Sequence, residues 1–216
     1  MTTARIRVLL VDDHTVVRQG LRRILESNSE IEIVGEVGDG RAAVEAVKRL
    51  KPAVAVVDIS LPGLNGIEVT RQVSKTVPET KILILSMHAD DAYIRQALKA
   101  GAKGYLLKDS DDHDLFKAVA AVSEGGSYFS PSVSRVLLDG YLGDHEEAYD
   151  ELSGLSDRER EVLQLIAEGK SNKEVAQILS LAVSTVDSHR KHLMEKLDLH
   201  NTAALVRFAA RKGLIQ

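Results

Sequence analysis

The sequence predicts two successive folds: an α/β unit with a parallel, doubly wound sheet, then an all-α unit of four helices. Three observations support this. Short apolar runs alternate with helix-like segments over residues 4–128, as expected for βαβ units whose helices cover both faces of a sheet. The runs are continuous rather than alternating with polar residues, as strands buried on both faces should be. From Ser156 onward only helical signals remain.

Five strands and five helices are expected in the first unit. The strands lie near residues 5–11, 31–37, 53–58, 80–86 and 103–107. The helices lie near residues 15–27, 40–50, 65–76, 90–100 and 111–124. Gly101 follows the fourth helix, where helices commonly stop.

The pattern changes after Ser130-Pro131. A short amphipathic helix is expected over Val133–Tyr141, followed by the acidic stretch GDHEEAYDELSG, which has no Lys or Arg. We interpret residues 129–152 as a linker that contains this helix.

The second unit, residues 153–216, begins with local helix signals. Ser156-Asp157-Arg158-Glu159 and Ser171-Asn172-Lys173-Glu174 are both capping boxes. Gly169 lies between them as a helix stop. Apolar spacing predicts helices near 157–168, 172–179, 184–197 and 202–212.

Composition excludes several classes of protein. The 216 residues are 44% apolar and 28% charged, which is ordinary for a globular chain. No apolar run approaches the roughly 18 residues of a membrane span, and the N-terminus lacks a secretory cleavage pattern. The absence of cysteine excludes disulfides and thiolate metal sites and fits a cytoplasmic protein. The net charge is −4, yet residues 187–216 carry six basic and three acidic residues.

Polar residues lie at the ends of four of the predicted strands: Asp12-Asp13, Asp58, Ser86 and Lys108. Strand ends of one kind share one edge of a parallel sheet, so these residues should converge on one pocket. Clustered carboxylates repel unless a divalent cation lies among them, and oxygen ligands suit Mg²⁺. Taken singly, each residue has a simpler explanation as a cap, a turn former or a surface charge. Their common place at strand ends favours a pocket that can hold a phosphorylated aspartate.

Two enzyme classes with an aspartate nucleophile or this fold do not fit the same residues. A dehalogenase-type phosphatase needs a second acid two residues after the nucleophile, where this chain has Ser60. A flavodoxin needs a phosphate-binding loop rich in small residues after its first strand, where this chain has Asp12-Asp13.

The stretches VLLVDDH, VVDISLPGLNGIEV, ILILSMH and AGAKGYLLK resemble the receiver domains of bacterial two-component response regulators, which have a flavodoxin-like fold. The resemblance implies that Asp58 takes a phosphoryl group from a histidine kinase. It implies that Mg²⁺ is bound by Asp13, Asp58 and the backbone carbonyl of Ser60, and by Asp12 through water. Ser86 and Lys108 would then hold phosphoryl oxygens.

Tyr105 occupies the aromatic switch position of that family. A Ser86 hydroxyl drawn towards phosphate can vacate space for the ring, which would couple the chemistry to the surface. A simple packed aromatic is the alternative. His88 is expected to be a loop residue.

Residues 172–179 and 184–197, joined by Ser180–Val183, have the spacing of a helix-turn-helix. Its expected core is Val175, Leu179, Val183, Val186, Leu193 and Leu197, with the small Ala176 where the helices approach closely. The opposite face of the second helix carries Asp187, Ser188, Lys191 and Glu195. That face would enter the major groove of DNA. A helical pair used only as a protein interface is the alternative.

The stretch LSDREREVLQLIAEGKSNKEVAQILSLAVSTVDSHRKHLMEKL resembles the output domains of the NarL/LuxR family of transcription factors. The resemblance implies that the last helix is a dimer contact and that Asp187, Ser188 and Lys191 face DNA, with Thr185 and Arg190 on phosphates. Position 187 departs from the lysine frequent in the family. An acid there can accept a hydrogen bond from cytosine N4.

The combined interpretation is a two-domain response regulator in which phosphorylation of Asp58 controls DNA binding. We expect the protein to take a phosphoryl group from a donor onto Asp58 and to hydrolyse that phosphoryl group itself. We expect no turnover of a free substrate. The expected partners are a histidine kinase, promoter DNA and a second copy of the chain, with no membrane. A phosphorylation-independent transcription factor and a true phosphatase are the alternatives. Phosphorylation would act by unmasking the recognition helix or by driving dimerisation.

Overall fold

The computed structural model describes residues 5–142, 152 and 154–215. Contacts divide the chain into two compact units, residues 1–144 and 145–216. No helix within the described ranges is both long and apolar enough to cross a membrane.

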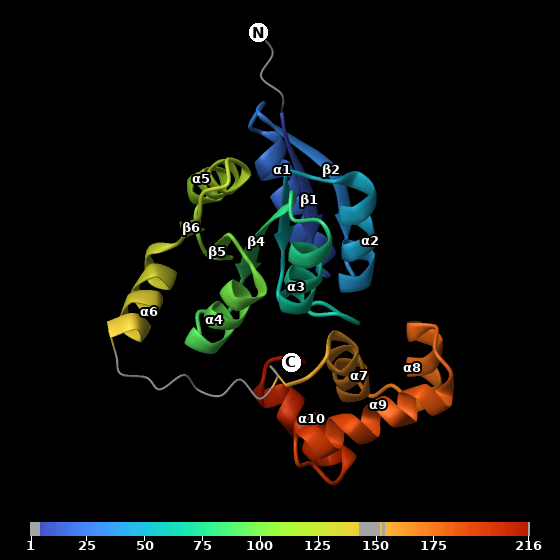
Figure 1. The fold of residues 1–216 in the computed structure, drawn as a ribbon. Coiled ribbons are helices and arrows are strands. Elements are labelled where there is room, and N and C mark those ends of the chain that lie inside the picture. Colours follow the sequence, from blue (N-terminus) through green and yellow to red (C-terminus); the bar gives the residue numbers. More distant parts are fainter. Residues whose placement is uncertain (1–4, 143–151, 153, 216) are drawn as a thin grey trace. The chain divides into compact units, whose positions relative to one another are not determined.

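The first unit is a parallel sheet with the strand order β2-β1-β3-β4-β5-β6 (Figure 1). Its strands are β1 Ile6–Val11, β2 Ile31–Val37, β3 Val54–Val57, β4 Lys81–Ser86, β5 Gly104–Leu107 and β6 Tyr128–Phe129. The helices are α1 Thr15–Glu26, α2 Gly40–Leu50, α3 Gly66–Thr76, α4 Asp91–Ala100, α5 Asp112–Ser123 and α6 Pro131–Leu142. Ten of these elements match the sequence predictions to within one residue at each end.

The sheet has six strands, so the prediction of five was wrong. The additional strand β6 is only two residues long and pairs with β5, with Gly104 opposite Tyr128 and Tyr105 opposite Phe129. A segment this short carries no periodic pattern, and its pairing depends on a tertiary neighbour.

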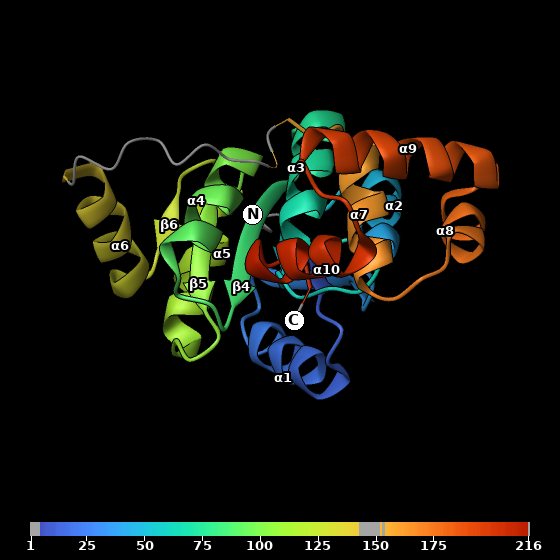
Figure 2. The same ribbon diagram turned by 90° about the horizontal axis from the view of Figure 1, so that it is seen from below.

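The two faces of the sheet are covered by different helices. Leu9 and Val11 pack with residues of α2, α3 and α4, whereas Val8 and Leu10 pack with residues of α1 and α5. This alternation follows from the two-residue period of a strand. Helix α1 accordingly lies across the sheet from α3 (Figure 2).

Helix α6 begins at Pro131, two residues before its expected start, because proline is well suited to the first turn of a helix. The sequence pattern assigns this helix to the linker of residues 129–152. Instead, Val133 is fully buried in the core that α2, α3 and α4 share, and α6 contacts α4. The acidic stretch that follows lies largely outside the described residues.

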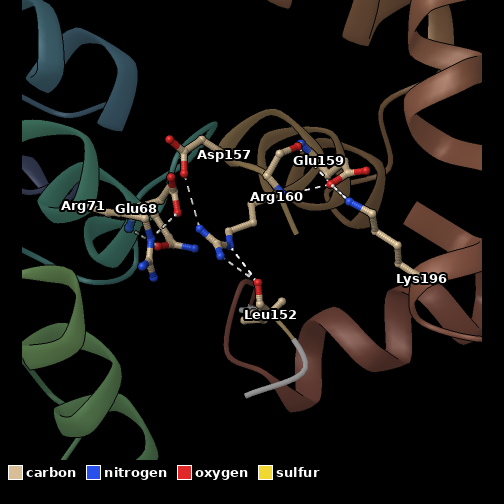
Figure 3. A network of polar contacts seen from close by, with 9 residues as sticks. Glu68, Arg71, Leu152, Asp157, Glu159, Arg160 and Lys196 are labelled. Atoms are coloured by element: carbon tan, nitrogen blue, oxygen red, sulfur yellow. Dashed lines mark hydrogen bonds and ion pairs between the residues drawn. The ribbon is translucent and has the colours of Figure 1, made fainter. Parts of the chain in front are cut away.

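The second unit consists of α7 Asp157–Ala167, α8 Asn172–Leu179, α9 Val183–Lys196 and α10 Thr202–Arg211. Both predicted capping boxes are present, at Ser156 and Ser171, and Gly169 has a φ of +84°. Figure 3 shows a hydrogen bond and an ion pair within this unit. Arg160 donates to the backbone carbonyl of Leu152 at 2.7 Å, and Lys196 pairs with Glu159 at 2.8 Å.

The core of the helix pair is close to the predicted one. Val175, Leu179, Val186 and Leu193 are buried, and so is Ala176, whereas Leu197 is half-buried. The prediction for Val183 was wrong, because this side chain is 44% exposed at the first position of α9. Instead, Leu181 packs against the core that residues of α7, α8 and α9 form. Leu181 lies in the turn between α8 and α9.

Candidate functional site

The candidate site lies at the carboxyl edge of the sheet, where β1 and β3 are neighbours. Connections from β1 run to the β2 side and connections from β3 run to the β4 side, and in open α/β sheets ligands bind at such a reversal. The Asp58 backbone N–H donates to the Val11 carbonyl at 2.8 Å, which continues the strand pairing into the loop. Asp12 and Asp58 therefore emerge side by side.

Lys108 joins the two buried acids from a third strand. Its Nζ lies 2.8 Å from Asp12 Oδ2 and 2.8 Å from Asp58 Oδ2. The Asp12 and Asp58 side chains are only 2% and 5% exposed, and that of Lys108 only 12%. One ammonium shared by two carboxylates leaves this pocket with a net negative charge.

Asp13 extends the acidic cluster outward, and His14 accompanies it. His14 Nδ1 lies 2.7 Å from Asp13 Oδ1, and the His14 backbone N–H donates to Asp12 Oδ1 at 2.8 Å. One ligand atom from each of Asp12, Asp13, His14 and Asp58 can be chosen so that all lie within 4.8 Å of one another. Sequence reasoning missed His14, although it stands directly after the acid pair in the loop that follows β1.

A glycine brings the loop after β3 close to the site. A Cβ added at Gly66 would lie only 2.0 Å from the Asp58 backbone oxygen, so only glycine fits there. Asn65 caps α3 by accepting from the Glu68 backbone N–H at 2.9 Å. Ser60, half-buried, lies in the loop between Asp58 and this helix.

Burial and charge shift the titration of the pocket in opposite directions. Burial raises the pKa of the Asp58 carboxyl, and Lys108 offsets part of that rise. Burial also opposes the charged form of Lys108, but the bonds to Asp12 and Asp58 outweigh it and raise the pKa of the ammonium. The lysine therefore stays charged, whereas burial makes ionisation of the Asp58 carboxyl unfavourable despite its pair with Lys108.

Ser86 and Tyr105 are connected through the backbone of His88. The His88 N–H donates to Ser86 Oγ at 3.1 Å, and the Tyr105 hydroxyl donates to the His88 carbonyl at 2.7 Å. Both side chains are fully buried, and burial raises the pKa of the Tyr105 hydroxyl well above its usual range. The His88 ring stacks on Tyr93 of α4, with ring centres 4.5 Å apart. Besides a direct interaction between the Ser86 and Tyr105 side chains, the His88 backbone therefore connects the predicted pair, which the sequence did not indicate.

The predicted DNA-facing residues all lie on α9 but differ in exposure. Asp187, Ser188 and Lys191 are exposed, and Thr185 and Arg190 are half-buried. The Ser188 hydroxyl donates to the Ser184 carbonyl at 3.0 Å within the helix.

Asn172, at the start of α8, holds two of these residues and was missed by sequence reasoning. Its Nδ2 donates to Asp187 Oδ1 at 2.5 Å, and its Oδ1 accepts from Arg190 Nη1 at 3.2 Å. Arg190 also donates to the Thr202 hydroxyl at the start of α10. Arg190 of α9 is therefore hydrogen-bonded within the domain and connects α9 to both α8 and α10.

The fold and this site define a doubly wound α/β domain with an acidic pocket at the carboxyl edge of its sheet, in the same chain as a helix-turn-helix domain. Residues 8–120 match the family described as "Response regulator receiver domain", and residues 153–209 match "Bacterial regulatory proteins, luxR family". The chain is 39% identical to the oxygen regulatory protein NreC of Staphylococcus haemolyticus over 97% of its length and 99% of that protein. It is 35% identical to the transcriptional regulatory protein DegU of Brevibacillus brevis, over 98% and 96% of the two chains.

Solved structures agree in both sequence and fold. A structure of the response regulator RcsB of Salmonella typhimurium shares 32% identity with a TM-score of 0.60, covering 97% of this chain and all of that one. An RcsB–DNA complex shares 32% identity with a TM-score of 0.59, covering 95% and 98%. The chain belongs to the DNA-binding response regulators of two-component systems that carry a LuxR-type helix-turn-helix.

Proposed function

We propose that Asp58 is the phosphoacceptor of this response regulator and that a histidine kinase is its donor. The main support for this proposal is the position of Lys108, which bridges Asp12 and Asp58 at the carboxyl edge of the sheet. A carboxylate oxygen of Asp58 attacks the phosphorus of a phosphohistidine and forms a P–O bond. The P–N bond breaks, its electron pair stays on the imidazole nitrogen, and that ring takes up a proton.

The donor set fits a divalent cation. Asp12, Asp13 and Asp58 supply carboxylate oxygens, and the Ser60 backbone carbonyl is the further ligand expected from the family resemblance. Hard oxygen donors of this kind suit Mg²⁺, which would offset the repulsion between phosphate and the acidic pocket. These four residues are the proposed holders of the cation.

Lys108 and Ser86 are the proposed partners of the phosphoryl group. Lys108 already contacts Asp58, so an ester at that carboxylate places a phosphoryl oxygen within reach of the ammonium. Ser86 is fully buried and is the last residue of β4, the neighbour of β3. Its hydroxyl can donate to a second phosphoryl oxygen.

The link from Ser86 to Tyr105 supports a switch. Movement of the Ser86 hydroxyl towards phosphate would disturb its bond from the His88 N–H, and the His88 carbonyl is the acceptor for Tyr105. Displacement of this short loop therefore reaches α4 through the stacked His88 and Tyr93 rings. Phosphorylation would thereby alter the α4 surface.

The exposed face of α9 is the proposed DNA-reading surface. Lys191 is 76% exposed and has only a weak pair with Glu195 at 3.8 Å, so it can turn to a phosphate or a guanine. Asp187 and Ser188 lie nearer the start of the helix, where base contacts are made. Thr185 and Arg190 are the proposed phosphate contacts, and Arg190 would have to exchange a bond within the domain for one to DNA.

The remaining partners follow from this function. A regulator of bacterial promoters acts on cytoplasmic DNA, and we assign the chain to that compartment. Two copies on paired half-sites would raise the effective concentration of each recognition helix, with α10 as their contact. No free substrate is turned over: the chemistry is limited to gain and loss of the phosphoryl group at Asp58.

DNA affinity with and without a small-molecule phosphodonor plus Mg²⁺ tests the proposal. Wild type and Asp58→Asn are compared at one salt concentration, because phosphate contacts make affinity strongly dependent on salt. Tightening that requires both the donor and Asp58 supports the switch. Equal affinity in all four samples would favour regulation independent of phosphorylation.

The two hypotheses for the switch, unmasking and dimerisation, are separated by sedimentation of the phosphorylated chain without DNA. A phosphorylated monomer with raised DNA affinity favours unmasking. A dimer favours association. Release of phosphate from a free ester by the wild type would instead indicate a phosphatase.

A further inference from the structure

His14 is the one nitrogen donor among the ligand atoms of the acidic cluster. Its Nδ1 lies 2.7 Å from Asp13 Oδ1 and 3.6 Å from Asp12 Oδ1. Two ligands of one octahedral cation lie about 3 Å apart when adjacent and about 4.2 Å apart when opposite, for bonds near 2.1 Å. The cluster, with all its atoms within 4.8 Å, is therefore close to the size that a single cation would require.

The backbone at His14 supports this placement. His14 stands at the N-cap of α1 in an extended conformation, with no side-chain bond to the helix. Its backbone N–H is tied to Asp12, so the imidazole is held beside the acids while remaining 62% exposed. The ring is thus free of a capping role and accessible to an ion from solvent.

We propose that His14 is a side-chain ligand of the divalent cation and that it shifts the preference of the site from Mg²⁺ towards first-row transition cations such as Mn²⁺. Imidazole binds these cations well, whereas Mg²⁺ is served by oxygen ligands. This inference rests on the proposed cation site and adds a ligand that determines which cation the site selects.

The test is binding of Mn²⁺ and Mg²⁺ to the full chain, without phosphodonor, at constant pH and salt. Calorimetry gives the two affinities, and electron spin echo modulation of bound Mn²⁺ detects a directly coordinated nitrogen. Wild type is compared with His14→Ala and with His200→Ala. His200 is a matched control, because it is 85% exposed and lies 3.7 Å from a single carboxylate, Asp198.

We expect a nitrogen signal in wild type and in His200→Ala, and its loss in His14→Ala. The ratio of Mn²⁺ to Mg²⁺ affinity should fall about tenfold in His14→Ala, the scale typical for a group that tunes a metal site. An unchanged ratio without a nitrogen signal in wild type would overturn the role of His14 and leave the phosphoacceptor site intact. Failure of wild type to bind either cation would overturn the cation site of the proposed function as well.

Discussion

The Tyr105 hydroxyl donates a 2.7 Å hydrogen bond to the backbone carbonyl of His88, and the backbone N–H of His88 donates to Ser86 Oγ. The pocket and the α4 side of the sheet thus meet at one loop residue. These two hydrogen bonds connect the Tyr105 side chain to Ser86, one of the proposed partners of the phosphoryl group.

Tyr105→Phe should uncouple the switch without blocking the chemistry. The ring remains buried but the His88 carbonyl loses its donor, at a cost of about 1 kcal/mol in unfolding free energy. Phosphorylation by a small-molecule donor should proceed as in wild type, while the donor-dependent gain in DNA affinity shrinks. Tyr128→Phe is the matched control, because its hydroxyl donates to Asp114 at 2.7 Å. Full tightening in Tyr105→Phe would contradict the proposed coupling.

Gly66→Ala should damage the site through the backbone. The added Cβ would meet the Asp58 carbonyl oxygen at 2.0 Å, so the loop must move. We expect a loss of about 1–3 kcal/mol in stability and slower phosphorylation. Gly20→Ala in α1 is the control: a Cβ there meets nothing within 4 Å, so a gain of about 0.5–1 kcal/mol is expected. Urea unfolding followed by tyrosine fluorescence reports mainly the first unit, since four of the five tyrosines precede residue 145. Equal stability of the two variants would exclude a close approach at Gly66.

Asp58→Asn should stabilise the metal-free chain at neutral pH. Burial raises the pKa of Asp58 above its ordinary value of 3.8, so the folded state binds the proton more tightly than the unfolded state does. Wild-type stability relative to the variant therefore falls as pH rises from about 3.8 through the raised pKa, and then stays constant. Urea midpoints across this range provide the measurement. A variant less stable than wild type at neutral pH would show that the pair with Lys108 outweighs the cost of burial.

Asp187→Lys should strengthen non-specific DNA binding. The change removes an acid from the exposed face of α9 and adds a cation, so the salt slope should steepen by about 0.9 for each added phosphate contact. Glu45→Lys makes the same change of charge on an exposed position of α2 and should leave the slope unaltered. Identical slopes for Asp187→Lys and wild type would place position 187 away from DNA.

Asn172→Ala should alter sequence preference more than overall affinity. Loss of the amide frees Asp187 and removes one of the bonds that hold Arg190, which keeps its bond to Thr202. Any selection for cytosine by the oriented carboxylate should therefore weaken. Binding to a panel of sites with single base changes provides the measurement, with a discrimination loss of about 1–3 kcal/mol at one position. Uniform loss across the panel would indicate a purely structural role for Asn172.

Much of this protein could be predicted from local sequence. Capping boxes at Ser156 and Ser171, the stop at Gly101 and the continuous apolar strands identified nearly all elements, because caps and periodicity act over a few residues. The convergence of Asp12, Asp58 and Lys108 was also predictable, since strand ends of a parallel sheet share an edge.

Tertiary structure decided the rest. The strand β6 exists because β5 offers it a partner, and Val183 is exposed while Leu181 packs against the helices instead. His14 and Asn172 became candidates only through neighbours at set distances. Local pattern specifies which backbone conformation a segment prefers, whereas the partners of a polar side chain depend on chain segments that meet only after folding.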